Sequence, residues 1–87
     1  MIDDPTVNSA PSLEVSYRSI SELKPDPRNA RTHPKKQVAE IARSIEAFGF
    51  TNPILVDGAG KVVAGHGRLL AAKALGMAKV PVIVLPH

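Results

Sequence analysis

The sequence predicts a small α+β domain with a mixed β-sheet and two main helices, in the order strand, helix, hairpin, helix, strand. Apolar residues alternate near the start of the chain, recur with helical spacing over residues 34–48, and form extended runs on both sides of a glycine-rich turn and near the C-terminus. The 87 residues suffice for one domain, which we place at residues 13–87. No apolar run approaches the roughly 18–20 residues of a membrane span, so we expect no membrane partner.

The first strand is predicted from the alternation of Leu13, Val15 and Tyr17 with polar neighbours. This pattern is typical of a half-buried strand, and we expect Tyr17 to belong to the core. Residues 1–12 are rich in proline, serine and aspartate and predict a disordered leader. Residues 24–34 contain three prolines and predict a loop without helix, because proline removes a backbone donor and restricts φ.

The first main helix is predicted over residues 34–48. Its apolar positions share one face: Val38, Ile41, Ala42, Ile45 and Phe48. We expect Thr32 or His33 at the N-cap, with Pro34 in the first turn. Gly49 is a natural C-terminal stop, and Phe48 is expected in the core.

A β-hairpin is predicted from the apolar runs 52–56 and 62–64, which flank the glycine-rich turn 57–61 with Asp57 at its corner. Strong helix formers over residues 68–75 predict the second main helix, which Gly76 ends. Residues 80–85 are nearly all apolar and predict a buried or central strand. We expect Pro81 at the beginning of this strand, where a missing N–H group is tolerated.

Positive charge is concentrated in one segment. Lysine and arginine exceed aspartate and glutamate by 11 to 8, a net charge of +3, and residues 24–36 hold five cations against one aspartate. Such a segment favours a phosphate-bearing partner, and we expect Arg28, Lys35 and Lys36 to contact DNA or another polyanion. One tyrosine and two phenylalanines are too few for the stacking surfaces of single-strand binders. The absence of cysteine excludes thiolate ligands and cysteine nucleophiles, and we predict no metal-binding residues.

The run Gly65-His66-Gly67-Arg68 separates an extended segment from the second predicted helix. A helix N-terminus exposes unpaired N–H groups, and glycine lets the backbone approach an anion closely. Arg68 adds a planar fork of donors suited to phosphate oxygens, and His66 can donate or accept a proton near neutral pH. The pattern predicts a phosphate-binding turn, although such a turn also occurs merely as a tight connection between strand and helix. Neither the Walker spacing nor the third glycine of G-x-G-x-x-G is present.

A series of segments resembles the ParB N-terminal domain of the ParB–sulfiredoxin superfamily. The segments are Asn29-Ala30-Arg31, residues 41–50, residues 52–56, residues 63–68, Ala71-Ala72 and residues 80–84. The resemblance covers roughly residues 14–85 and implies a small α+β fold that binds a nucleoside triphosphate. It assigns Asn29 and Arg31 to a first nucleotide-binding motif and residues 65–68 (Gly65, His66, Gly67 and Arg68) to a second. It also implies CTP or ATP with Mg²⁺ as the cofactor, and makes Ala71 and Ala72 the small residues that let the second helix pack closely.

The sequence departs from this family in two ways. The second motif reads Gly-His-Gly-Arg, whereas partition proteins carry a Gly-Glu-Arg-Arg-like motif, and the missing cysteine excludes the sulfinic acid reduction of sulfiredoxins. The turn looks most like that of ParB-like domains that precede phage-type DNA methyltransferases or regulators. We therefore expect an N-terminal piece of a longer, cytoplasmic, nucleoid-associated protein of a bacterium or phage. For that full-length protein the resemblance implies DNA as a partner and a homodimeric state.

Three functions are compatible with these features. The first is a nucleotide- or phosphate-binding module of a DNA-associated protein that acts in partition, transcription regulation or DNA modification. The second is an enzyme, a phosphohydrolase, nuclease or small-molecule kinase, in which His66 is the candidate catalytic acid or base and Arg68 stabilises transition-state charge. The third is a protein-interaction domain without a ligand site. The carboxylates form no paired motif for Mg²⁺, which favours the binding module over the enzyme.

Overall fold

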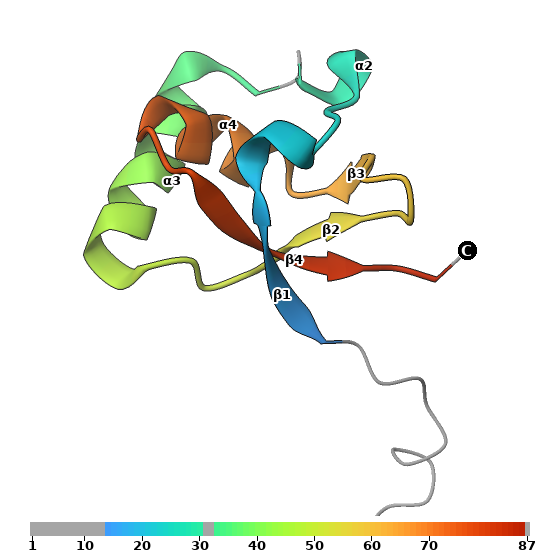
Figure 1. Ribbon diagram of the computed structural model, residues 1–87. Coiled ribbons are helices and arrows are strands. Elements are labelled where there is room, and N and C mark those ends of the chain that lie inside the picture. The colour runs from blue at the N-terminus through green and yellow to red at the C-terminus, as the bar shows by residue number, and fades with distance from the viewer. Residues whose placement is uncertain (1–13, 31–32, 87) are drawn as a thin grey trace, which may run out of the picture.

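The computed structural model describes residues 14–30 and 33–86 of the chain. Its elements are β1 (Val15–Ser19), the 3-10 turn η1 (Ile20–Glu22), α2 (Pro27–Ala30), α3 (Lys35–Phe48), β2 (Ile54–Val56), β3 (Val62–Ala64), α4 (His66–Ala74) and β4 (Lys79–Val84) (Figure 1). The predicted α+β class and the order of the main elements are confirmed. The predicted leader at residues 1–12 lies outside the described residues.

The four strands form one mixed sheet in the order β1-β4-β2-β3. β4 runs antiparallel to β1 and parallel to β2, and the β2–β3 hairpin completes the sheet. The predicted central position of the last strand is therefore confirmed. The Asp57 side chain closes the hairpin as predicted, because its Oδ1 accepts the N–H groups of Ala59 and Lys61, each at 2.9 Å.

Pro81 stands third in β4 rather than at its beginning, as the sequence had suggested. It faces Tyr17 across the β1–β4 ladder. Since Ile20 N–H donates to Ala78 O in the same register, Tyr17 and Pro81 form a non-hydrogen-bonded pair. Pairing of β4 with β2 begins only at Val82. The missing N–H of Pro81 consequently interrupts neither ladder.

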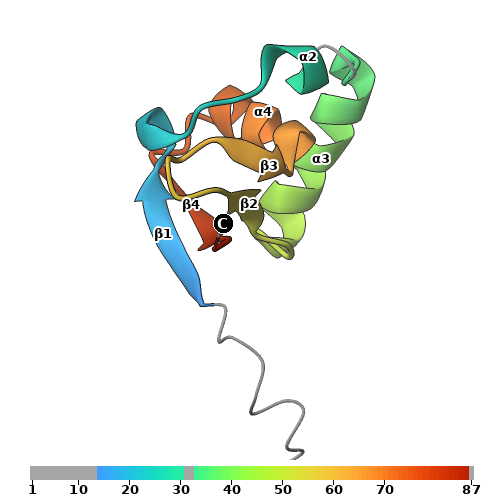
Figure 2. The same ribbon diagram turned by 90° about the vertical axis from the view of Figure 1, so that its right-hand side faces the viewer.

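α4 packs on one face of the sheet and α3 packs against α4, while no described helix covers the other face (Figures 1 and 2). The core between helices and sheet consists of Leu23, Ile54, Val56, Val62, Leu69, Ala72, Val80 and Val82. Ala71 and Ala72 are fully buried, as expected for small residues on a closely packed helix. In the described part of the chain, no helix is long and apolar enough to cross a membrane.

The ends of the two main helices differ slightly from the predictions. α3 begins one residue later than predicted, with Pro34 rather than His33 or Thr32 at its N-cap (Thr32 lies outside the described residues). Gly49 ends α3 with a φ of 77°, as expected. α4 begins at His66, two residues earlier than predicted, because the chain turns into the helix at Gly65 itself.

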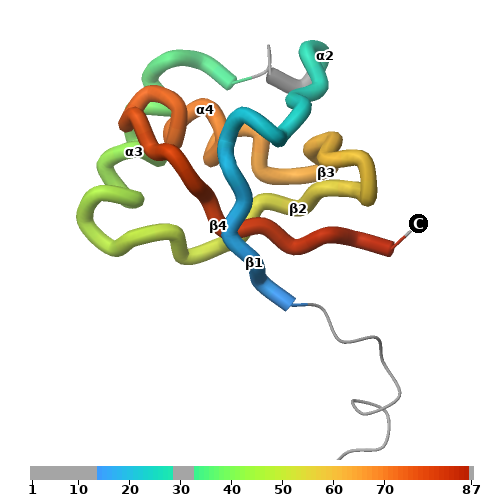
Figure 3. Tube along the Cα trace, in the orientation of Figure 1, coloured from blue at the N-terminus to red at the C-terminus, as the bar shows by residue number. Residues whose placement is uncertain are grey.

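The expectation of a loop without helix over residues 24–34 is wrong, since α2 forms one short helical turn there. Pro27 takes the first helical position, where its missing N–H has no helical acceptor to lose. Asp26 precedes it, and its Oδ1 accepts the N–H of Arg28 at 3.0 Å, as an N-cap does. The trace in Figure 3 shows the chain running from the end of β1 to α2.

Tyr17 and Phe48 do not belong to the core, contrary to prediction. Tyr17 is 68% exposed, and its neighbour Val15 is 53% exposed, because β1 is an edge strand and its alternating apolar side chains lie on the uncovered face. The predicted strand is thus confirmed, but the prediction that one of its faces is buried is wrong. Phe48 is 79% exposed because the last turn of the 14-residue α3 runs past the beginning of the 9-residue α4.

Candidate functional site

The Gly65–Arg68 turn borders a pocket of about 420 Å³. One wall comes from α3 and the segment before it, with His33, Gln37 and Ile41. The other comes from Val63 in the middle of β3 and from residues 65–68. The pocket therefore opens at the point where an edge strand of the sheet runs into α4 and α3 crosses beside it.

The floor of this pocket is a helix N-terminus without a side-chain cap. Gly65 occupies the N-cap with φ 97° and ψ 24°, and within the described part of the chain no side chain caps the first N–H groups of α4. The first intrahelical bond runs from Leu69 N–H to Gly65 O at 2.9 Å. The N–H groups of residues 66–68 precede it and have no acceptor within the helix, so together with the helix dipole they favour an anion.

Arg68 carries the positive charge of the site. Its Nε is buried and lacks a hydrogen-bond partner among the described residues. Its Nη2 lies close to the turn, 3.5 Å from the position that a Cβ on Gly65 would take. The side chain also borders a second pocket of about 190 Å³ on the side of Ser44 and Asn52. The guanidinium therefore lies between two pockets, with a donor that an oxyanion could satisfy.

His66 is buried, with 5% of its surface exposed, although it is among the residues that line the pocket. Its Nε2 accepts the backbone N–H of Asp26 at 3.4 Å, which leaves the proton of the neutral ring on Nδ1. Burial lowers the pKa of His66 below its ordinary value of 6.5; the charge of Asp26 opposes this effect and that of His33 adds to it. His66 is therefore neutral at pH 7 and holds the segment before α2 against the start of α4.

Gly67 lies where two side chains beside α4 approach its backbone closely. A Cβ at this position would lie 2.9 Å from Ile41 Cδ1 and 3.2 Å from His33 Nδ1. His33 Nδ1 in turn lies 3.1 Å from Gln37 Oε1, within hydrogen-bond distance. The glycine thus keeps both the helix crossing and the open pocket, which a side chain would fill.

The structure brings together only part of the predicted phosphate-binding set. Residues 65–68 all line the pocket, and His33 joins them from the basic segment. Their predicted contact with phosphate stays a prediction. Asn29 lies in α2, but its side chain is not among the described ones, and Arg31 lies outside the described residues. The assignment of these two residues to a first motif therefore stays a prediction.

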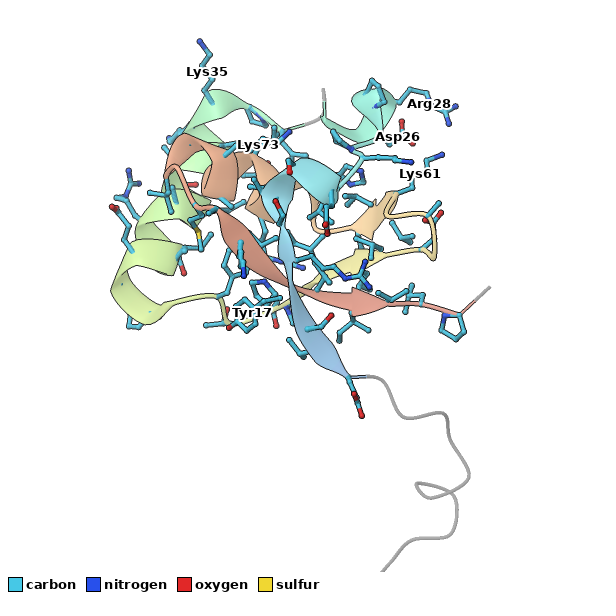
Figure 4. All side chains as sticks on the ribbon, viewed as in Figure 1. Tyr17, Asp26, Arg28, Lys35, Lys61 and Lys73 are labelled. Atoms are coloured by element: carbon cyan, nitrogen blue, oxygen red, sulfur yellow. The ribbon has the colours of Figure 1, made fainter. Side chains whose placement is uncertain are left out.

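The three residues predicted to contact a polyanion do not line the pocket. Arg28 lies on α2 with its Nε 3.6 Å from Asp26 Oδ1, and Lys61 lies near the same carboxylate (Figure 4). The N–H of Arg28, followed by the positive charges, lowers the pKa of the Asp26 carboxyl. Lys35 and Lys36 are exposed at the start of α3. Lys35 lies at a different place on the surface from Arg28 (Figure 4).

Sequence reasoning missed Gln37 and the role of Asp26. Gln37 follows His33 by four residues and precedes Ile41 by four, so helical spacing could have placed all three on one face. For Asp26, the order Asp-Pro signals a helix N-terminus. Its contact with His66 joins residues 40 positions apart and has no local signal.

Comparison with known proteins shows similarity to one family over most of the chain. Residues 5–86 match the family model of the ParB N-terminal domain. The chain is 53% identical over 73 residues to the ParB-like nuclease domain-containing protein YnaK of Escherichia coli K12, covering 84% of each chain. It covers only 21% to 28% of the length of further relatives, among them bacterial chromosome-partitioning proteins named ParB.

Several solved structures share the fold, among them a partition protein and a sulfiredoxin. The C-terminally truncated chromosome-partitioning protein ParB of Caulobacter crescentus, complexed with CTP-γ-S, superposes with a TM-score of 0.74 at 30% identity, over 85% of this chain and 45% of that one. Sulfiredoxin from Arabidopsis thaliana gives a TM-score of 0.76 at 18% identity, over 85% and 86% of the two chains. At that identity the second likeness concerns the fold alone.

Proposed function

This chain belongs to the ParB N-terminal domain family, and we propose that it is the nucleotide-binding module of a DNA-handling protein. The pocket beside residues 65–68 receives the phosphates of a nucleoside triphosphate such as CTP, with Mg²⁺ as the accompanying ion. DNA is a partner of the whole protein, which is a cytoplasmic protein of a bacterium or phage and acts at the bacterial nucleoid.

The observation that carries the proposal is the buried Nε of Arg68, which has no partner among the described residues, beside three amides at the start of α4 that have no acceptor within the helix. Burying a guanidinium N–H without a partner is unfavourable, and a phosphate oxygen relieves this cost. The pocket is of a size suited to a small ligand. Further support comes from the similarity to a partition protein whose structure holds a CTP analogue.

The Gly-His-Gly-Arg turn supports phosphate binding through fewer charges than a Gly-Glu-Arg-Arg-like motif would. Only Arg68 contributes a cation within the turn, and His66 is neutral and engaged with Asp26. Backbone amides therefore provide most of the donors. They contact phosphate and not base, so base preference rests on residues outside the turn.

The test is calorimetric titration of the chain with CTP, ATP and GTP, each with and without Mg²⁺. Arg68→Ala should weaken binding of the preferred nucleotide by about 1.5–3 kcal/mol, or roughly 10- to 150-fold, because a charge-assisted bond is lost. Arg43→Ala, which removes an exposed arginine from α3, is the matched control and should leave affinity unchanged. Far-UV circular dichroism checks that both variants fold. Equal affinities for wild type and Arg68→Ala would refute the phosphate assignment.

A nuclease is the second candidate, because the similar Escherichia coli protein carries that activity in its name. His66 would be its acid or base, yet the ring is buried and its Nε2 already accepts an N–H. The same preparations, incubated with plasmid DNA and Mg²⁺, separate the two functions. Cleavage that disappears in His66→Gln would favour the nuclease, whereas nucleotide binding without cleavage favours the binding module.

A further inference from the structure

Among the described residues, no strand pairs with the outer edge of β1. β1 lies at one end of the sheet. The hydrogen bond from Ile20 N–H to Ala78 O fixes which residues of β1 direct their backbone N–H and C=O groups toward β4 and which direct them outward. Ser16 and Arg18 therefore turn their backbone groups toward β4, whereas Val15 and Tyr17 turn theirs outward. Unpaired strand edges of this kind readily pair with another strand.

The opposite edge of the sheet is already occupied. Lys24 N–H donates to Gly60 O, and Val62 N–H donates to Lys24 O, each at 2.9 Å. Lys24 thus forms an isolated β-bridge with Lys61 on the outer side of the hairpin. β1 is accordingly the edge at which another strand can be added.

The sequence of β1, together with Glu14 directly before it, is complementary to itself in the antiparallel direction. When two copies pair about Ser16, Glu14 of each faces Arg18 of the other, and Val15 faces Tyr17. Glu14, Ser16 and Arg18 are all exposed, and the small Ser16 side chains meet at the symmetry axis. Opposite charges and a β-branched residue beside an aromatic one are favourable cross-strand pairs.

The alternation of backbone groups agrees with the same register. Pairing about Ser16 places Val15 opposite Tyr17, and both have outward N–H and C=O groups, so each pair exchanges two hydrogen bonds. Pairing about Tyr17 would face Ser16 with Arg18 and leave the charge of Arg18 without a partner in the strand. The register about Ser16 thus satisfies the backbone and the charges together.

We propose that two copies of this chain associate through β1 in this register and form a continuous sheet across a two-fold axis. The arrangement is isologous, since the same strand serves on both sides. It places the exposed Val15 and Tyr17 of each copy beside those of the other. The proposal does not depend on the nucleotide site, which lies at the other end of the sheet order beside β3.

The test uses charge reversal and sedimentation velocity over a wide concentration series. Glu14→Lys and Arg18→Glu each place like charges opposite one another at two points, and each should raise the dissociation constant about tenfold or more. A mixture of the two variants restores both opposite-charge pairs, because Lys at 14 then faces Glu at 18 and the native Glu14 faces the native Arg18. The mixture should therefore dimerise where each variant alone is monomeric.

Two further variants make the result decisive. Tyr17→Pro removes an outward N–H without touching the β4 ladder, and should abolish the dimer. Arg43→Glu, a charge reversal on the exposed side of α3, should leave the dimer intact. Thermal melts check that every variant folds. A wild-type chain that is monomeric throughout the series overturns the proposal, as does a dimer that survives Tyr17→Pro or shows no rescue in the mixture.

Discussion

Replacing Gly65 with alanine should destabilise the fold more than the same change at Gly76 or Gly58. Gly65 adopts a φ of 97° at the N-cap of α4, and a Cβ there would lie 3.3 Å from the Cα of Ile54. Because that neighbour is a backbone atom of a fully buried strand residue, it cannot rotate away. The substitution thus combines an unfavourable backbone conformation with a close contact.

The two effects can be given magnitudes. A non-glycine residue in the left-handed region costs about 1–2 kcal/mol, and crowding in a packed region adds on the order of 1–3 kcal/mol. The lower entropy of the unfolded chain offsets about 0.4–1 kcal/mol. We expect Gly65→Ala to lower the free energy of unfolding by about 2–3 kcal/mol, a large share of the roughly 5 kcal/mol typical of a small domain.

Two glycines serve as matched controls. Gly76 has a φ of 73°, but no described atom lies within 4 Å of its added Cβ, so Gly76→Ala should cost only about 1 kcal/mol. Gly58 has neither a positive φ nor a close neighbour among the described atoms, and Gly58→Ala should be neutral or slightly stabilising. Equilibrium urea denaturation followed by far-UV circular dichroism measures all three. Equal losses for Gly65→Ala and Gly76→Ala would show that the Ile54 contact is unimportant and refute this reasoning.

Two predictions concern other parts of the fold. Because burial lowers the pKa of His66, the unfolded chain takes up its proton more readily. The contribution of His66 to stability is therefore fully present above its unfolded pKa of 6.5 and is lost as the pH falls from there through the lower pKa of the folded state. His66→Gln keeps an acceptor for Asp26 N–H but cannot titrate, so thermal melts should show a weaker pH dependence, and an unchanged slope would contradict the role of His66. Leu69→Ala should lower the free energy of unfolding by about 2–5 kcal/mol, because Leu69 is fully buried in the core, whereas Phe48→Ser should change it by less than about 0.5 kcal/mol. Similar losses in urea denaturation for both would place Phe48 in the core after all.

Local patterns were sufficient for most of the secondary structure. The helical spacing of Val38, Ile41 and Ile45, with Gly49 as a stop, predicted α3 to within one residue. The hairpin and its Asp57 corner also followed from short-range signals, because turns depend on neighbouring residues. Where a local signal was misread, as at Asp26-Pro27, the missing step was recognition of proline at a first helical position.

The burial of individual side chains could not be predicted from local patterns. Tyr17 and Phe48 have apolar rings at the expected periodic positions, yet both are exposed. Periodicity identifies a face of a strand or helix, but only the neighbouring elements decide whether that face is covered. β1 lies at the sheet edge, and α3 extends beyond α4, and neither fact is encoded locally.

For the candidate site, too, local conformation followed from the sequence, whereas burial and contacts did not. The sequence by itself determined that residues 65–68 form a glycine-flanked helix start with an adjacent arginine, because strand, glycine and helix formers follow one another directly. Only the tertiary structure decided that His33 and Gln37 complete the pocket, that His66 is engaged with Asp26, and that Arg68 Nε is buried without a described partner. The physical reason is that backbone conformation is set by nearest neighbours, whereas burial and partners depend on contacts between residues far apart in the chain.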